Sequence, residues 1–163
     1  MAYDTSEWTE LFVASAGASA ALAGLVFVAV SINVERILQF PGLPERALET
    51  VLLLLAVVLV SLMGLIPGQS ATALGIELLL VGLALAAMIV KQSTKTLPEG
   101  SPTTSHLLGR LLLWAGGTVP FVVGGASLIA ETGGGLYWVA AGILLGIVGG
   151  VANAWVLLVE ILR

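Results

Sequence analysis

The sequence predicts an all-α bundle of transmembrane helices, and two observations lead to that fold class. Hydrophobic residues make up 58% of the 163 residues, charged residues make up only 10%, and the mean hydropathy is +1.09. An ordinary soluble domain carries about a quarter charged residues. Long uncharged stretches also alternate with short polar turns, and about 20 apolar residues are enough to cross a hydrocarbon core of about 30 Å. We therefore expect a single polytopic membrane domain over residues 1–163.

The first predicted helix covers about residues 8–36 and carries no charge between Glu10 and Glu35. Asp4, followed three residues later by Glu7, is typical of a helix start. One stripe of this helix consists mostly of small residues, which let two helix backbones approach closely within a bilayer. The small members of the stripe are Ala14, Gly17, Ala21 and Gly24.

The next two helices are predicted over residues 44–66 and 70–91, joined by the turn Pro67-Gly68-Gln69-Ser70. Pro44 suits the first turn of a helix, where its missing N–H is not needed, and Ser70 suits an N-cap. A re-entrant hairpin is the alternative for this pair. Each arm has about 17 to 20 apolar residues, a length that favours two full spans.

Two more helices complete a predicted set of five. Residues 104–130 follow the polar loop Lys91–Ser105 and are expected to bend at Pro120, whose ring interrupts the backbone hydrogen bonds. Thr132–Gly135 is a short turn, and residues 136–162 form the last helix.

The charges predict the orientation of the bundle. With five spans, every lysine and arginine falls on one side, and only acidic residues fall on the other. This distribution follows the positive-inside rule and places the N-terminus outside and the C-terminus inside the cell. A re-entrant hairpin would give the same partition. The basic residues are Arg36, Arg46, Lys91, Lys95, Arg110 and Arg163.

Composition and motifs argue against several function classes. A net charge of −4 argues against nucleic-acid binding, which needs a basic face. The chain has no cysteine for disulfides or thiolate chemistry, and His106, the single histidine, lacks partners for a metal site. Because the sequence contains no catalytic or phosphate-binding motif, we expect no enzyme activity, no cofactor and no metal.

A second set of small residues lies on the last predicted helix. Gly142, Gly146 and Gly150 are spaced by four residues, a glycine zipper typical of a close helix-packing face. Packing within one subunit is the simpler interpretation, and a seam between subunits that lines a pore is the alternative. Because small-residue stripes on several helices exceed what one small bundle needs internally, we expect a homo-oligomer.

Glutamates near the predicted outer side are candidates for an ion pathway, namely Glu10, Glu77 and Glu131. Glu77 lies about 10 Å along its helix at 1.5 Å per residue. A carboxylate at that depth needs a hydrogen bond, a proton, water or a cation, and Ser15, Ser19 or Tyr137 lie at a suitable depth to donate. In an oligomer the acids would form rings that concentrate cations; a purely structural role is the simpler interpretation.

Polar residues at the inner ends of three helices are expected to form a clasp, with pairs such as Glu35–Arg110 or Arg36–Glu160. A docking surface for a partner is the functional alternative. The set comprises Asn33, Glu35, Arg36, Arg110, Asn153 and Glu160.

Several segments resemble a known family: residues 20–33 (AALAGLVFVAVSIN), 40–46 (FPGLPER), 66–69 (IPGQ), 135–138 (GLYW) and 153–163 (NAWVLLVEILR). Together they are similar to a family of small, mainly actinobacterial multipass membrane proteins, some of which are labelled as modulators of a membrane-bound AAA protease. The resemblance implies a bacterial cytoplasmic membrane location and a five-helix design.

Two functions follow as expectations. The first is a non-enzymatic scaffold or modulator that binds the lipid bilayer, its own copies and other membrane proteins. The second is a homo-oligomeric, cation-permeable channel with an acidic outer mouth. Few polar residues fall at mid-membrane depth, and this favours the scaffold.

Overall fold

The computed structural model describes residues 2–40, 42–95 and 104–162, with the backbone only for residues 89–90, 92–95, 104–114 and 160–162. The described chain is helical apart from its turns, so the predicted all-α class is confirmed for this part. The elements are the 3-10 helix η1 (Thr5–Trp8) and the α-helices α1 (Thr9–Ile32), α2 (Val34–Gln39), α3 (Leu43–Gly64), α4 (Ala71–Lys95), α5 (Thr104–Ala130) and α6 (Leu136–Leu162).

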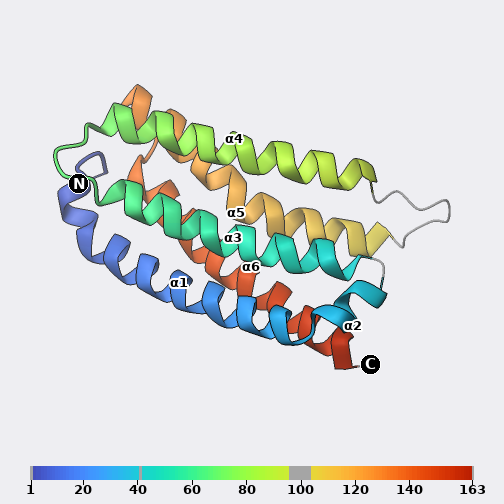
Figure 1. Cartoon of the computed structure of the whole chain (residues 1–163). Coiled ribbons are helices and arrows are strands. Elements are labelled where there is room, and N and C mark those ends of the chain that lie inside the picture. Colours follow the sequence, from blue (N-terminus) through green and yellow to red (C-terminus); the bar gives the residue numbers. More distant parts are fainter. Residues whose placement is uncertain (1, 41, 96–103, 163) are drawn as a thin grey trace.

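The long helices lie side by side in a bundle (Figure 1). α4 packs on α5, α5 on α6, and α6 on α3, while α3 and α4 make a smaller contact that closes this four-helix arrangement. α1 lies outside it, packed mainly along α3 and only slightly against α6. The N-terminus and the α3–α4 and α5–α6 turns lie at one end, called here the N-terminal end. The short helix α2 and the C-terminus lie at the opposite, C-terminal end.

Four helical stretches within the described residues are long and apolar enough to cross a membrane: Thr5–Ile32, Leu43–Gly64, Ala71–Met88 and Leu136–Val159. The described side chains of α5 add a shorter apolar stretch, Ala115–Ala130. α3 has 22 residues and α4 has 25, which correspond to about 33 and 38 Å at 1.5 Å per residue. Neither arm is too short to cross a hydrocarbon core of about 30 Å.

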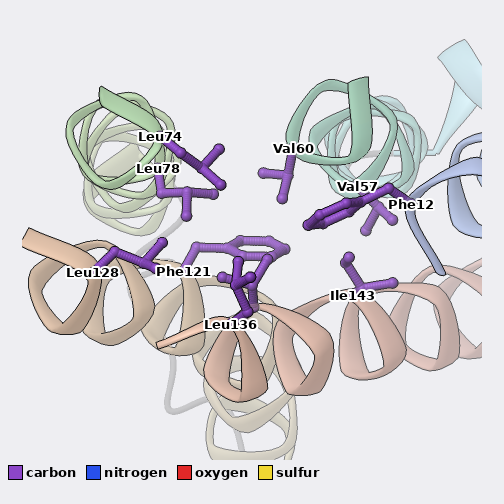
Figure 2. Packing of buried hydrophobic residues seen from close by; sticks show 10 residues of the cluster. Phe12, Val57, Val60, Leu74, Leu78, Phe121, Leu128, Leu136 and Ile143 are labelled. Atoms are coloured by element: carbon purple, nitrogen blue, oxygen red, sulfur yellow. The ribbon is translucent and has the colours of Figure 1, made fainter. Parts of the chain in front are cut away.

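One hydrophobic core joins all the long helices. Figure 2 shows side chains from α1, α3, α4, α5 and α6 meeting at the centre of the bundle. Its buried members are Phe12, Val57, Val60, Leu74, Leu78, Phe121, Leu128, Leu136, Val139 and Ile143. Aromatic and aliphatic side chains therefore fill the middle of the bundle at this level. A smaller cluster at the C-terminal end joins α2, α3 and α6 through Ile37, Leu43, Ala47 and Leu157.

The first helix, predicted over about residues 8–36, is shorter in the structure, where α1 covers Thr9–Ile32 and the next residues form the separate short helix α2. Asn33 is the C-cap of α1, and its side-chain Nδ2 donates to the Ala29 carbonyl at 2.8 Å. An asparagine that bonds the backbone in this way competes with the helical ladder and favours a helix end. The predicted start is also displaced, since Asp4 caps η1 rather than α1 by accepting from the Ser6 N–H at 3.0 Å.

The other predicted helices agree with the structure within a few residues. α5 and α6 have the predicted bounds, α3 ends two residues early at Gly64, and α4 continues to Lys95. Ser70 is the N-cap predicted for α4, because its Oγ accepts from the Ala73 N–H at 3.2 Å.

Candidate functional site

The glycine ladder of α6 faces the inside of the bundle. A Cβ added at Gly146 would lie 2.6 Å from Val57 of α3, and one added at Gly142 would lie 2.7 Å from Phe121 of α5. A Cβ at Gly150 would lie 2.6 Å from Leu54 of α3. Large side chains of two neighbouring helices thus occupy the space that the glycines leave. Within the chain, the ladder serves as a packing face for α3 and α5.

The small-residue stripe of α1 has the opposite placement. Ala14, Gly17, Ala21 and Gly24 are all exposed, and a Cβ added at Gly17 or Gly24 would meet no atom of the described residues within 4 Å. α1 instead packs on α3 through a different face, whose buried residues are Phe12, Ser15 and Ser19. The stripe therefore contacts no other described part of the same chain closely.

The spacing of this exposed stripe has a regular period. From Glu10 the stripe continues through Ala14, Gly17, Ala21, Gly24, Val28 and Ser31, and every member is exposed. The steps alternate between four and three residues, which is the seven-residue repeat of the a and d positions of a coiled coil. A helix with this repeat packs against a partner at a crossing angle of about 20°. α1 thus presents a continuous packing face directed away from the bundle.

The contact between α1 and α3 includes a buried pair of hydroxyl groups, whereas the Ser19 Oγ on the same face of α1 is buried without a hydrogen-bond partner among the described residues. The Oγ atoms of Ser15 and Ser61 lie 2.8 Å apart and form a buried hydrogen bond between the two helices. The Ser15 Oγ also lies 2.7 Å from the Leu11 carbonyl of its own helix. Beside this pair, the ring of Phe12 lies against Gly64, where a Cβ would come within 2.5 Å of the ring.

Residues 2–8 fasten α1 to the start of α6. The Leu136 N–H donates to the Ala2 carbonyl at 2.8 Å, and the Gly134 N–H donates to the Tyr3 hydroxyl at 3.2 Å. The rings of Trp8 and Tyr137 meet edge to face, with centroids 4.9 Å apart and an interplanar angle of 86°. α1 is therefore attached most firmly at the N-terminal end of the bundle.

Gly135 allows Ala2 and Tyr3 to lie close to the start of α6. Its φ is +51°, a left-handed conformation that favours glycine. A Cβ at this position would also overlap the Ala2 carbonyl oxygen and the Tyr3 ring.

The three predicted pathway glutamates lie at the N-terminal end but do not converge. Glu10 and Glu131 are exposed, whereas Glu77 is half-buried on α4. The Gln69 Nε2 donates to the Glu77 carboxylate at 2.7 Å. The partner is thus none of the three donors expected from depth along the helix. Within the described residues, no three His, Cys, Asp or Glu side chains are grouped to hold a metal ion.

The residues of the predicted inner clasp lie at the C-terminal end, but the paired contacts fall outside the described residues. Glu35 and Arg36 are exposed on α2, and Asn153 is buried on α6. The side chains of Arg110 and Glu160, which the two expected pairs require, lie outside the described part of the chain. Asn33 uses its amide to bond the backbone of its own helix.

The sequence analysis does not identify two polar residues that the structure singles out, Gln69 and Glu49. Gln69 lies in the predicted turn, but an amide beside an N-cap is well placed to contact the helix that follows. Glu49 on α3 is only 5% exposed. It lies four residues before Leu53 and eight before Val57, both of them buried, so the helical period could have identified it as inward-facing.

Comparison of the chain with protein-family models, with curated proteins and with solved structures gave no match. The geometry defines the class of protein: a bundle of long apolar helices with an apolar core, the described basic side chains at one end, and a small-residue face on α1 that no other described residue packs against closely.

Proposed function

We propose that this chain is a non-enzymatic multipass protein of a bacterial cytoplasmic membrane that acts by packing α1 against other transmembrane helices, either of its own copies or of other membrane proteins. The observation that carries the proposal is the exposed seven-residue repeat of α1. Helices in lipid associate through close van der Waals contact between small residues. The α6 ladder already packs against α3 and α5, which leaves α1 as the face for a partner.

The proposed orientation, with five spans and the N-terminus outside, rests on the separation of charge between the two ends. Arg36, Arg46 and Lys91, whose side chains are described, belong to elements or helix ends at the C-terminal end. Acidic residues prevail at the N-terminal end: Asp4, Glu7, Glu10, Glu77 and Glu131. This separation supports the proposed orientation, because the positive-inside rule places the basic end in the cytoplasm. Labelling single cysteines from either side of the membrane tests the orientation directly.

Cross-linking tests the packing role. The chain has no cysteine, so a cysteine introduced at Ala21, on the stripe, is the only thiol. Ala20→Cys is the matched control, because Ala20 is exposed on the same helix but lies off the stripe. In native membranes we expect cross-linked products from Ala21→Cys and far fewer from Ala20→Cys. Products of twice the chain mass would identify a second copy, and heavier products of other mass another protein. Equal cross-linking at both positions would contradict the proposal.

A cation pathway between copies is the second candidate, favoured by the position of Glu10 at the start of the same stripe. Copies that meet along α1 would bring their Glu10 carboxylates together at the acidic end, as in the acidic rings of cation channels. Flux through proteoliposomes that carry the wild type, compared with Glu10→Gln and with empty liposomes, tests this candidate. Flux that depends on Glu10 would support a channel, whereas no flux from a folded oligomer would leave the packing role.

A further inference from the structure

An apolar groove of about 120 Å³ lies between α1 and α6 near the C-terminal end. Leu25, Val26, Ala29 and Val30 of α1 face Ala154 and Leu157 of α6 across the groove. All of the described side chains that line it are apolar.

The groove results from the way in which α1 is attached. Contacts near the N-terminal end hold the first half of the helix, but no residue of α1 after Ser19 is buried. At the C-terminal end, Ile37 of α2 belongs to the same buried cluster as Leu157 of α6, and Val30 of α1 packs against this cluster. Because Leu157 and Val30 also line the groove, α2 lies next to this part of the groove.

The groove and α2 together have the chemistry of a site for one phospholipid. The α1 lining ends three residues before Asn33, so in a bilayer it would lie within the leaflet that adjoins α2. α2 exposes Leu38 and, at its end, Phe40, and it carries the exposed Arg36 next to Ile37. Apolar side chains beside a cation are typical of a helix that lies at the headgroup level.

We propose that this groove holds one acyl chain of an anionic phospholipid, with the lipid phosphate bound at α2 and Arg36 as its cation. The proposal requires the membrane insertion proposed above but not the outward packing face of α1. An apolar groove excludes water as a stable occupant, and a lipid chain is the apolar molecule available at this depth. The described basic side chains Arg36, Arg46 and Lys91 belong to this end of the bundle, together with Glu35, Glu45 and Glu49, whereas the described residues of the opposite end include no lysine or arginine. An anionic headgroup therefore finds a described cation only at this end.

Native mass spectrometry of the full chain in a mild detergent tests the proposal, with dioleoyl phosphatidylglycerol and dioleoyl phosphatidylethanolamine as probes. We expect one phosphatidylglycerol per chain to bind about fivefold more tightly than phosphatidylethanolamine, the effect of one cation near an anionic headgroup. Arg36→Gln should remove this preference. Equal affinity of the wild type for the two lipids, or a preference that Arg36→Gln leaves unchanged, would overturn the proposal.

Substitutions that fill the groove test where the acyl chain lies. Ala29→Phe fills the groove from α1, and Ala154→Phe fills it from α6. Each should weaken the first phosphatidylglycerol about tenfold, equivalent to about two methylene groups that are no longer buried. Ala20→Phe is the matched control, since it adds the same ring on an exposed part of α1 outside the groove. Affinities equal to that of the control would overturn the proposal.

The comparison of the two lipids on the wild type does not depend on any variant, so equal affinities would overturn the proposal even if both groove variants fail to fold. Loss of cross-linking at Ala21 with retained lipid binding would refute the packing role of α1 and leave the lipid site standing.

Discussion

Gly64→Ala tests whether the contact between Gly64 and the ring of Phe12 holds α1 on the bundle. The added Cβ would lie 2.5 Å from the Phe12 Cε2 and 2.6 Å from its Cζ, whereas carbon atoms pack at about 3.5–4.0 Å. Phe12 is only 1% exposed, so its ring cannot turn into solvent and must shift by about 1 Å against its neighbours to restore that separation. Insertion of a carbon into a packed core costs about 1–3 kcal/mol, and we expect Gly64→Ala to lower the free energy of unfolding by this amount relative to a helical Gly→Ala change without such an overlap, which gains the same helix propensity.

Reversible unfolding in mixed dodecylmaltoside and dodecyl sulfate micelles, followed by circular dichroism, measures the effect. Gly116→Ala on α5 is the control, because it adds the same methyl group where the nearest described atoms, those of Leu145, lie at 3.8 Å, an ordinary contact distance. In a helix, alanine is favoured over glycine by up to about 1 kcal/mol, so the control should be neutral or stabilising. Phe12→Leu combined with Gly64→Ala should cost less than the sum of the single changes, because the smaller side chain makes room. Equal stability of Gly64→Ala and Gly116→Ala would refute this account of how α1 is held.

Three further outcomes follow from the hydrogen bonds. Ser15→Ala should lower the free energy of unfolding by about 1–3 kcal/mol, because it leaves the buried Ser61 hydroxyl without its Ser15 partner. Ser61→Ala should lower it by less in the same assay, since Ser15 keeps its hydrogen bond to the Leu11 carbonyl; equal costs would contradict this. Hydrogen bonds from the Ser6 side chain and backbone lower the pKa of Asp4, so Ser6→Ala should raise that pKa in a carboxyl carbon-13 NMR titration. A lowered pKa stabilises the folded cap above the unfolded pKa and loses that effect as pH falls through the folded pKa, so the cap of the variant should be lost at higher pH than that of the wild type. Gly135→Ala should displace the N-terminal segment and speed hydrogen exchange at the first amide of α6; unchanged exchange would show that the segment is not held there.

The helices that the sequence predicted best are those with abrupt boundaries. α5 and α6 have the expected bounds, and the turn between them contains Gly133, Gly134 and Gly135, all at positive φ. The break at Asn33 was missed because hydropathy reports only whether a residue suits the bilayer. The break depends on the hydrogen bond from the Asn33 side chain to one carbonyl. Hydropathy does not detect this bond, and the next residue, Val34, is apolar.

The partner of Glu77 shows a second limit. Depth along the helix suggested donors on other helices, since a carboxylate within a bilayer must find a hydrogen bond at its own level. Gln69 donates to the Glu77 carboxylate from the turn just before the same helix. Depth counted along the helix leaves out the residues of the preceding turn, although their side chains can extend toward the helix. The length of a glutamine side chain is enough to change which partner is nearest.

The two small-residue faces show most clearly what sequence can and cannot decide. Both consist of small residues at helical spacing, and that spacing indicates only that a neighbour could approach closely. In α6 the neighbours are large side chains on α3 and α5, more than 20 residues away in sequence, which enter the space beside Gly142, Gly146 and Gly150. On α1 the side chains that reach α3 lie on the other face, so Gly17 and Gly24 have no such neighbour among the described residues. Since close packing between helices in lipid depends on contact with a partner, a small-residue face left open by its own chain is where a partner would add most contact. This places the expected function on the outer surface of α1 rather than in the apolar interior of the bundle.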